Sequence, residues 1–184
     1  MKCQGKECKC NNITEEKLIT QYIDIQHIIC YNEKCIGSIK NIFREFNRRD
    51  EEYLTLPKKK PFYLLIKIPF ICRVNLTSIL IRTSFQKMRL YKNRDLEFED
   101  IIEKRHDGEY NLPIDLHYLN IQIRGGMRDV SVLHILLMGD EKSELNYCGI
   151  KGCLSESIQG PIITVYEARS SDSLRIERTK QIYN

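Results

Sequence analysis

FYLLIKIPFICRVNLTSILIRTSFQKMRLYKN, residues 62–93, is the part of the sequence with the strongest strand pattern. β-Branched and aromatic residues dominate it, and such side chains pack well on a pleated sheet. We predict strands over residues 62–68, 74–82 and 87–93, with Pro69 ending the first because proline cannot donate to a ladder. The connections are shorter than the crossover that a parallel return requires, so the strands are predicted to pair as an antiparallel β-meander.

The rest of the chain repeats this pattern of short apolar segments separated by turn residues. Asp107-Gly108 and Gly125-Gly126 mark two of the turns. Further strands are predicted over residues 109–112, 116–123, 130–138 and 161–168. The apolar run 130–138 is typical of a central strand, and residues 140–160 are predicted to form a polar loop. Many short strands with almost no helix predict an all-β fold, an antiparallel β-sandwich.

The five most apolar predicted strands are expected to share one core, to which each contributes a central side chain. These residues are Leu65, Ile79, Leu90, Ile121 and Leu136.

Thr14, followed by two glutamates, is a candidate helix cap and predicts a short helix that runs toward Ile19.

Composition predicts a soluble protein of one domain. The chain has 184 residues, 42% of them hydrophobic, and a formal net charge of +4, which permits an acidic partner without requiring nucleic acid. No apolar run reaches the roughly 18 residues of a membrane helix, so we expect no membrane contact. The N-terminus lacks a secretory signal, and the eight cysteines are therefore expected to be reduced thiols in the cytoplasm or nucleus.

A family resemblance rests on the same central stretch. LLIKIPF, VNLTSILI and MRLYKN, followed by LEFED, resemble the core signature of the PITH domain, which is named for the proteasome-interacting C-terminal region of a thioredoxin-like protein. Upstream, YIDIQHIICYNE resembles the family's entry segment, with Cys30, Asn32 and Glu33 at the family's positions. Downstream, LHYLNIQI, VSVLHILLMGD and ITVYEARSSD resemble the late strands and tail of the stand-alone members, and Cys8-Lys9-Cys10 resembles a Cys-x-Cys near their N-terminus.

The resemblance implies a jelly-roll sandwich of the galactose-binding-like type. It implies an N-terminal arm at 1–13, the domain at 14–168 and a C-terminal tail at 169–184. It also implies irregular, extended chain over residues 37–50, which we prefer to the amphipathic helix that the apolar spacing there suggests. In function it implies a non-enzymatic adaptor or modulator on the regulatory particle of the proteasome, monomeric outside that complex and found in cytoplasm and nucleus.

No motif in the sequence predicts catalysis or a bound cofactor. A Walker loop, G-x-S-x-G, H-E-x-x-H and a dinucleotide fingerprint are all absent. Without a C-x-x-C, the redox activity of the thioredoxin-fused relatives is not expected here. His134 lies inside an apolar segment, so we interpret it as a hydrogen-bonded structural imidazole rather than a metal ligand. Glu51-Glu52 and similar pairs are interpreted as solvated turn residues rather than a general acid and base.

Cysteine spacing raises one metal hypothesis. Cys3, Cys8 and Cys10 form a C-x4-C-x-C pattern, and a four-residue gap occurs between zinc ligands. No histidine follows at ligand spacing, so we favour ordinary reduced thiols and expect no metal site.

The candidate partner-binding residues of the domain are basic. Lys58, Lys59 and Lys60 precede the LLIKIPF strand, where the family usually carries acidic residues, and this is a departure from the family pattern. Arg89, Tyr91 and Lys92 follow in the third predicted strand. A solvated loop is the simpler interpretation of the lysine run. The alternative function is a basic face for RNA or ribosomal phosphate.

The C-terminal tail is a second candidate docking element. Arg175, Arg178 and Tyr183 lie among apolar residues there, a mixture suited to folding against a groove on a partner.

Carbohydrate binding is the least favoured function for the predicted sandwich, because the chain has no Trp and its ten Tyr are scattered.

Overall fold

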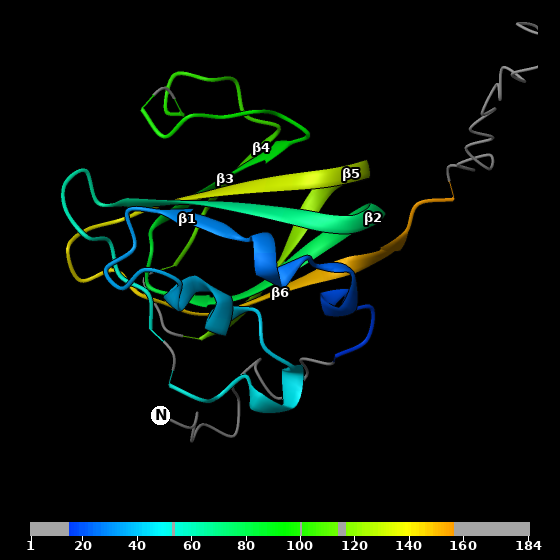
Figure 1. The fold of residues 1–184 in the computed structure, drawn as a ribbon, viewed down its shortest axis with the longest axis horizontal. Coiled ribbons are helices and arrows are strands. Elements are labelled where there is room, and N and C mark those ends of the chain that lie inside the picture. The colour runs from blue at the N-terminus through cyan, green and yellow to red at the C-terminus, as the bar shows by residue number, and fades with distance from the viewer. Residues whose placement is uncertain (1–14, 53, 100, 114–116, 157–184) are drawn as a thin grey trace, which may run out of the picture.

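The computed structural model describes residues 15–52, 54–99, 101–113 and 117–156 of the chain. Over these ranges the protein is an antiparallel β-sandwich with little helix, as predicted (Figure 1). The strands are β1 (Ile29–Tyr31), β2 (Tyr63–Thr83), β3 (Lys87–Lys92), β4 (Gly108–Asn111), β5 (Tyr118–Met138) and β6 (Leu145–Leu154). The short 3-10 helices are η2 (Thr20–Tyr22), η3 (Ile25–His27), η4 (Ser38–Ile42) and η5 (Phe46–Arg48).

Two strands of 21 residues each, β2 and β5, form the frame of the sandwich. They pair antiparallel from Tyr63 opposite Met138 to Arg82 opposite Tyr118. The register shifts between Pro69 and Ser78, where both strands bend, so each strand contributes to both layers (Figure 1). One layer has the order β1-β2-β5-β3-β4, and β6 pairs with the other half of β2.

The predicted strands 62–68 and 74–82 are therefore two halves of one strand. Pro69 does not end the first half: it lies opposite Val132, and its carbonyl accepts a hydrogen bond from the backbone N–H of Asp24 (2.9 Å). The register shift that begins after Pro69 allows the ladder to continue without the missing N–H. In the same way β5 joins two predicted strands, and the positive φ of Gly125 and Gly126 bends it without ending it.

The predicted β-meander is wrong, because β3 does not pair with β2. It lies between β5 and β4, with Leu90 opposite both Ile135 and Gly108. Residues 84–86 lead from the β6 side of the sandwich to the other layer, and Phe85 in this connection is fully buried. The connection is short but joins strands of different layers. In its place beside β5, β3 directs its apolar side chains into the core.

β6 occupies residues that the sequence predicts to be a polar loop. Two glycines give this segment its loop-like composition; close packing against the main chain requires Gly152, and Gly149 lies close to neighbouring side chains. A Cβ at Gly152 would lie 2.1 Å from the carbonyl oxygen of Asn75, and one at Gly149 would lie 2.8 Å from Leu18 Cδ2. Glycine here marks the close approach of another chain segment rather than a turn.

The helical segments also differ from expectation. Residues 37–50 form η4 and η5 instead of extended chain, and the buried Arg44 side chain holds the turn after η5 by donating to the carbonyls of Arg48 (2.6 Å) and Arg49 (2.7 Å). Residues 15–19 form no helix, and Leu18 pairs with Lys151 of β6. In the described part of the chain, no helix has the length and apolar character to cross a bilayer.

The buried apolar side chains form two clusters, so the single predicted core is wrong. The main cluster fills the space between the layers and includes Ile79 and Leu90, with Ile121 packed against it. Leu65 and Leu136 belong to an outer cluster on the other face of β2 and β5, covered by the chain between β3 and β4. The outer cluster consists of Tyr63, Leu65, Tyr91, Leu96, Ile101 and Leu136. Because both faces of these strands are apolar, the sequence lacks the alternation that would separate the two clusters.

Several predicted features lie outside the described residues. They are Cys3, Cys8 and Cys10, the strand 161–168, and the tail with Arg175, Arg178 and Tyr183.

Leu136→Ala tests the outer cluster. Leu136 is fully buried, so we expect its truncation to lower the free energy of unfolding by about 2–5 kcal/mol in a urea titration. Ile71→Ala is the control, because that side chain is 65% exposed and its loss should cost less than about 0.5 kcal/mol. Equal effects of the two substitutions would contradict the burial of Leu136.

Candidate interaction surface

Asn32, the residue after β1, clamps the loop that leads into β2. Its φ of 69° is a left-handed conformation that asparagine adopts more readily than most residues. The side-chain nitrogen Nδ2 lies 2.9–3.0 Å from the carbonyl oxygens of Lys59, Pro61 and Tyr63. The side-chain oxygen Oδ1 in turn accepts from the backbone N–H of Lys59 (3.3 Å). One amide group thus fixes the main chain of the lysine run.

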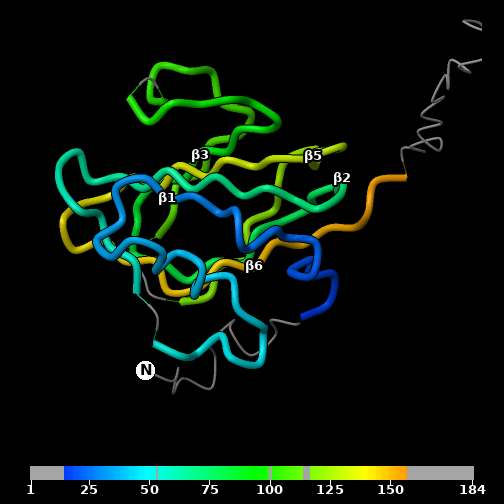
Figure 2. The backbone as a smooth tube through the Cα atoms, in the orientation of Figure 1, coloured from blue at the N-terminus to red at the C-terminus, as the bar shows by residue number. Residues whose placement is uncertain are grey.

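Backbone hydrogen bonds join the same two loops. The N–H of Lys58 donates to the carbonyl of Asn32 (2.6 Å), and the N–H of Lys34 donates to the carbonyl of Leu56 (2.8 Å). Figure 2 shows the turn after β1 and the segment before β2 at the same end of the sandwich. The two loops therefore form one fixed unit.

Glu33 closes the turn after β1. Its buried carboxylate accepts from the backbone N–H groups of Gly37 (2.6 Å) and Ile39 (3.0 Å) and from the Ser38 hydroxyl (3.0 Å). These N–H groups belong to the first turn of η4, where carboxylates are favourable partners. The Asn-Glu pair thus has a structural role.

Burial, and secondarily the charge of Glu33, raises the pKa of the Cys30 thiol well above its usual range, which disfavours the reactive thiolate.

Four exposed lysines project from this unit. They are Lys34, Lys58, Lys59 and Lys60, which we call the lysine patch. Within the described residues, none of the four has a carboxylate at ion-pair distance. Some basic side chains elsewhere are paired: Lys87 lies 3.3 Å from Glu109, and Arg94 lies 2.7 Å from Asp107. The lysine patch is therefore a concentration of uncompensated positive charge on a fixed backbone.

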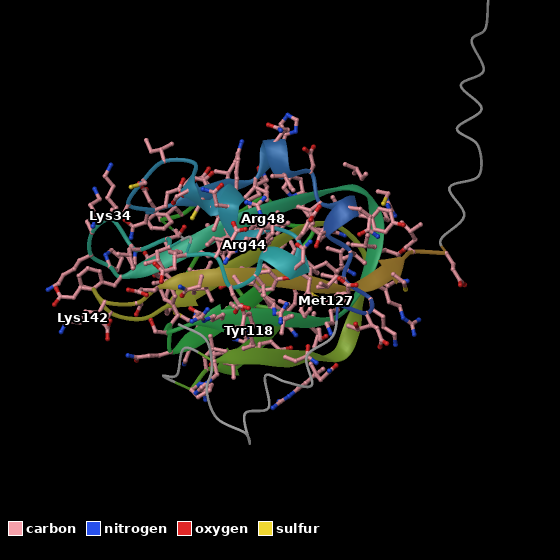
Figure 3. The ribbon with its side chains drawn as sticks, turned by 90° about the horizontal axis from the view of Figure 1, so that it is seen from below. Lys34, Arg44, Arg48, Tyr118, Met127 and Lys142 are labelled. Atoms are coloured by element: carbon pink, nitrogen blue, oxygen red, sulfur yellow. The ribbon has the colours of Figure 1, made fainter. Side chains whose placement is uncertain are left out.

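An apolar side chain accompanies the lysine patch. Ile36, in the same turn as Lys34, is 93% exposed. Figure 3 shows Lys34 at the end of the molecule where Lys142 also lies. A single exposed isoleucine is common on protein surfaces and does not by itself indicate a contact surface, but it adds an apolar group beside the lysine patch.

The predicted basic residues of β3 lie elsewhere and are engaged within the fold. Arg89 is ion-paired with Glu109, and its hydrogen bond lowers the pKa of that carboxyl. Tyr91 is fully buried in the outer cluster and so is not on the surface. Lys92 Nζ donates to the carbonyl of Arg128 (2.7 Å). The structure thus brings the lysine run together with Lys34, which the sequence did not single out, and separates it from β3.

His134 is fully buried on the outer face of β5, opposite Lys67 on one side and Tyr91 on the other. The hydrogen bond expected from the sequence is not found: neither ring nitrogen has a partner among the described residues. Burial, and then the charge of Lys67, lowers the pKa of the imidazole to about 4, with a small opposing effect from Asp95. A buried imidazole beside Lys67 and Tyr91 lacks the companion ligands of a metal site, and no group of three metal-ligating residues occurs in the described ranges.

A shallow cleft of about 450 Å³ lies where β2, β5 and β6 bend. Its polar residues are occupied with one another: Asn75 Oδ1 accepts from the backbone N–H of Asp129 (3.0 Å), and the Ser155 hydroxyl donates to the Asp129 carboxylate. The described cysteines are all free thiols. None of these groups forms a nucleophile with an adjacent base, which acyl or phosphoryl chemistry requires.

These features define an antiparallel β-sandwich domain that presents a fixed, charged loop to solvent. The chain belongs to the PITH domain family, whose model matches residues 9–170.

Curated relatives carry the same domain without a thioredoxin fusion. PITH domain-containing protein GA19395 of Drosophila pseudoobscura pseudoobscura is 28% identical over 161 residues, which are 81% of this chain and 76% of that protein. PITH domain-containing protein ZK353.9 of Caenorhabditis elegans is 26% identical over 163 residues, 83% of this chain and 78% of the relative. The human PITH domain-containing protein 1 is 27% identical over 161 residues, with shares of 81% and 76%.

Solved structures confirm the jelly-roll fold of the galactose-binding-like type. The CBM32-1 and CBM32-2 domains of Clostridium perfringens ZmpB match with a TM-score of 0.52 and 11% identity, over 82% of this chain and 41% of that one. The C-terminal domain of a Bacteroides fragilis chitobiase matches with a TM-score of 0.50 and 9% identity, over 77% of this chain and 97% of the other. At these identities the likeness concerns the fold alone.

Asn32→Ala tests the clamp. It removes the hydrogen bonds of the side chain and disfavours the left-handed backbone, so we expect a loss of about 2–4 kcal/mol of stability. Asn32→Gly removes the same hydrogen bonds but accepts the backbone conformation, and it should cost about 1 kcal/mol less. In both variants trypsin should cut after Lys58 and Lys59 faster than in the wild type. An unchanged cleavage rate would mean that other contacts fix this loop.

His134→Leu tests the buried imidazole. The folded-state pKa of about 4 lies below the ordinary value of 6.5, so between these pH values the unfolded chain binds the proton more readily. We therefore expect His134 to lower the stability of the wild type by up to about 3 kcal/mol as the pH falls from 6.5 to 4. His134→Leu should remove this component, whereas His27→Gln, at a side chain that is 76% exposed, should retain it. Parallel stability curves for wild type and His134→Leu would contradict the assignment.

Proposed function

We propose that this protein is a non-enzymatic interaction module that docks on the proteasome, through its regulatory particle, as an adaptor or modulator. Membership of the PITH family supports this proposal, since the domain is named for a proteasome-interacting region. Its place of action would be the cytoplasm and nucleus, where proteasomes operate.

The lysine patch is the observation that carries the proposal. In the described part of the chain these four positive charges on adjacent loops have no carboxylate at ion-pair distance, so they repel one another, and a partner with negative charge would relieve that repulsion. The Asn32 clamp fixes the main chain beneath them, so little backbone freedom is left to lose on binding. Charge of this kind also accelerates encounter with an oppositely charged surface.

RNA or ribosomal phosphate is the second candidate partner, and the same unpaired charges support it. The two candidates differ in their dependence on salt. Binding to a phosphate backbone releases counterions and weakens steeply as salt rises, whereas a protein interface with an apolar contribution weakens less.

The test is recovery of the tagged full-length chain from extract of its own cells at about 0.1 and 0.4 M salt, with the co-purifying proteins identified. We expect regulatory-particle subunits at both concentrations. Lys58→Ser/Lys59→Ser/Lys60→Ser should reduce their recovery several-fold with little change in the melting temperature, because in the described structure these side chains have no ion pairs and lose only the contact of Lys60 Nζ with the Phe62 ring (5.8 Å). Ribosomal material that disappears at high salt would support the RNA candidate instead, and the absence of proteasome subunits at both concentrations would end the proposal.

A control variant is available at the bend of the long strands. Arg73→Ser/Arg124→Ser/Arg128→Ser removes three exposed positive charges from β2 and β5 and so matches the change in net charge. It should leave proteasome recovery unchanged. Equal losses from the two triple variants would mean that net charge, rather than the lysine patch, governs recovery.

A further inference from the structure

An aromatic strip lies on the outer face of the first layer. Tyr31 of β1 stacks on Phe98, with ring centroids 5.9 Å apart and planes at 24°, and Phe98 contacts Tyr63 at 5.0 Å. Ile29 lies two residues from Tyr31 and therefore on the same face of β1. Ile29 is 44% exposed and Tyr31 is 37% exposed. We call Ile29, Tyr31 and Phe98 the aromatic strip. Tyr31 and Phe98 contact each other, and Ile29 and Tyr31 are exposed to solvent.

The aromatic strip and the lysine patch are linked through Asn32. Asn32 directly follows Tyr31, and its amide holds the carbonyl of Tyr63, whose ring contacts Phe98. The same amide holds the carbonyl of Lys59. The clamp therefore fixes the main chain of Tyr63 relative to that of the lysine run, and the aromatic strip and the lysine patch lie on segments that Asn32 joins.

Acidic residues lie on the Phe98 side of this surface. Glu97 and Glu99 flank Phe98 in the chain, and both are exposed. Asp95 is also exposed, and its carboxylate lies 3.8 Å from Nζ of Lys67. Lys67 belongs to β2 and pairs with Ile29 of β1. Positive charge is thus found at the Asn32 loop and negative charge around Phe98. A partner must therefore place its negative charge at the Asn32 loop and avoid negative charge near Phe98.

We propose that this surface binds a protein segment in which a bulky apolar side chain follows a short acidic run. The carboxylates of the segment pair with the lysine patch, and the apolar side chain packs on Tyr31 and Ile29. Beyond that point the segment carries no acidic residue, because Glu97 and Glu99 would repel it. This inference rests on the proposed function and adds the chemistry that the partner presents.

The acidic residues around Phe98 favour a protein segment over RNA. A nucleic-acid strand carries a negative charge at every nucleotide, so a strand that pairs with the lysine patch and stacks on Tyr31 would bring phosphates toward Asp95, Glu97 and Glu99. A peptide can limit its carboxylates to one end. The mixed charge of the surface thus disfavours a uniform polyanion and places the acidic end of a peptide at the lysine patch.

Synthetic probes test this preference with the full-length protein. Fluorescein-labelled Glu-Glu-Asp-Gly-Leu-Phe-Gly-Ser is compared by fluorescence anisotropy with Ser-Ser-Asn-Gly-Leu-Phe-Gly-Ser, which lacks the acidic run, and with Glu-Glu-Asp-Gly-Ser-Ser-Gly-Ser, which lacks the apolar pair. A single-stranded RNA of eight nucleotides is the fourth probe. We expect the first peptide to bind about tenfold more tightly than each of the other three, a difference of about 1.4 kcal/mol.

Variants then locate the binding. Lys58→Glu/Lys59→Glu/Lys60→Glu should weaken the first peptide by about tenfold or more, and Tyr31→Ser should weaken it several-fold. Ile71→Ser, at an exposed apolar residue of β2 outside this surface, is the control and should have no effect. Equal binding of all three peptides, unchanged binding in both test variants, or tighter binding of the RNA would overturn the inference. Association of the free protein into dimers that Tyr31→Ser abolishes would also overturn it, because a second copy would then occupy the surface.

The outcomes separate this inference from the proposed function. If the peptide preference is found but no proteasome subunit is recovered from extract, the surface chemistry holds and the proteasome assignment fails. If proteasomes are recovered but the peptides do not discriminate, docking uses another surface and the inference fails.

Discussion

The antiparallel pairing of β2 with β5 is the interaction on which the rest of the structure depends. Both strands bend and serve both layers, so their shared ladder sets the register of each layer. β1 and β6 pair with opposite halves of β2. β3 pairs with the second half of β5, and β4 pairs with β3. A shift by one residue would move Leu64 and Ile66 out of the main cluster and would bring Leu65 into it. The same ladder therefore specifies both apolar clusters.

Asparagine side chains attach the loops to this frame. Asn32 binds the loop before β2, Asn75 receives the N–H of Asp129 in β5, and Asn93 Oδ1 accepts from the N–H groups of Ser131 (2.8 Å) and Val132 (3.1 Å). Asn32 and Asn93 both adopt positive φ. The amide group suits this role because it donates and accepts at once, so one side chain can satisfy several main-chain groups of a neighbouring segment. The candidate surface inherits its rigidity from such contacts.

The sequence was sufficient to predict the β-sandwich and the central place of residues 130–138, because runs of β-branched and apolar residues report strand content directly. It was insufficient for the pairing order, since a short connection does not reveal that residues 84–86 pass between layers. β6 was missed because the glycines that packing requires resemble those of a turn. In the candidate surface, Lys58, Lys59 and Lys60 were found as a charge run. Lys34 and Tyr31 were missed because only the Asn32 clamp and the Phe98 contact bring them beside that run.

The Asn32 clamp has a consequence for divergence within the family. Its hydrogen bonds to the lysine run engage only main-chain atoms, so they do not depend on which side chains occupy positions 58, 59 and 60. Substitution of these positions leaves the loop conformation and the strand register as they are. Descendants of a common ancestor can therefore exchange basic for acidic residues there in single mutational steps without passing through unstable intermediates. Under the proposed function, partner choice and foldability therefore rest on separate sets of residues, and selection can change the first while it conserves the second.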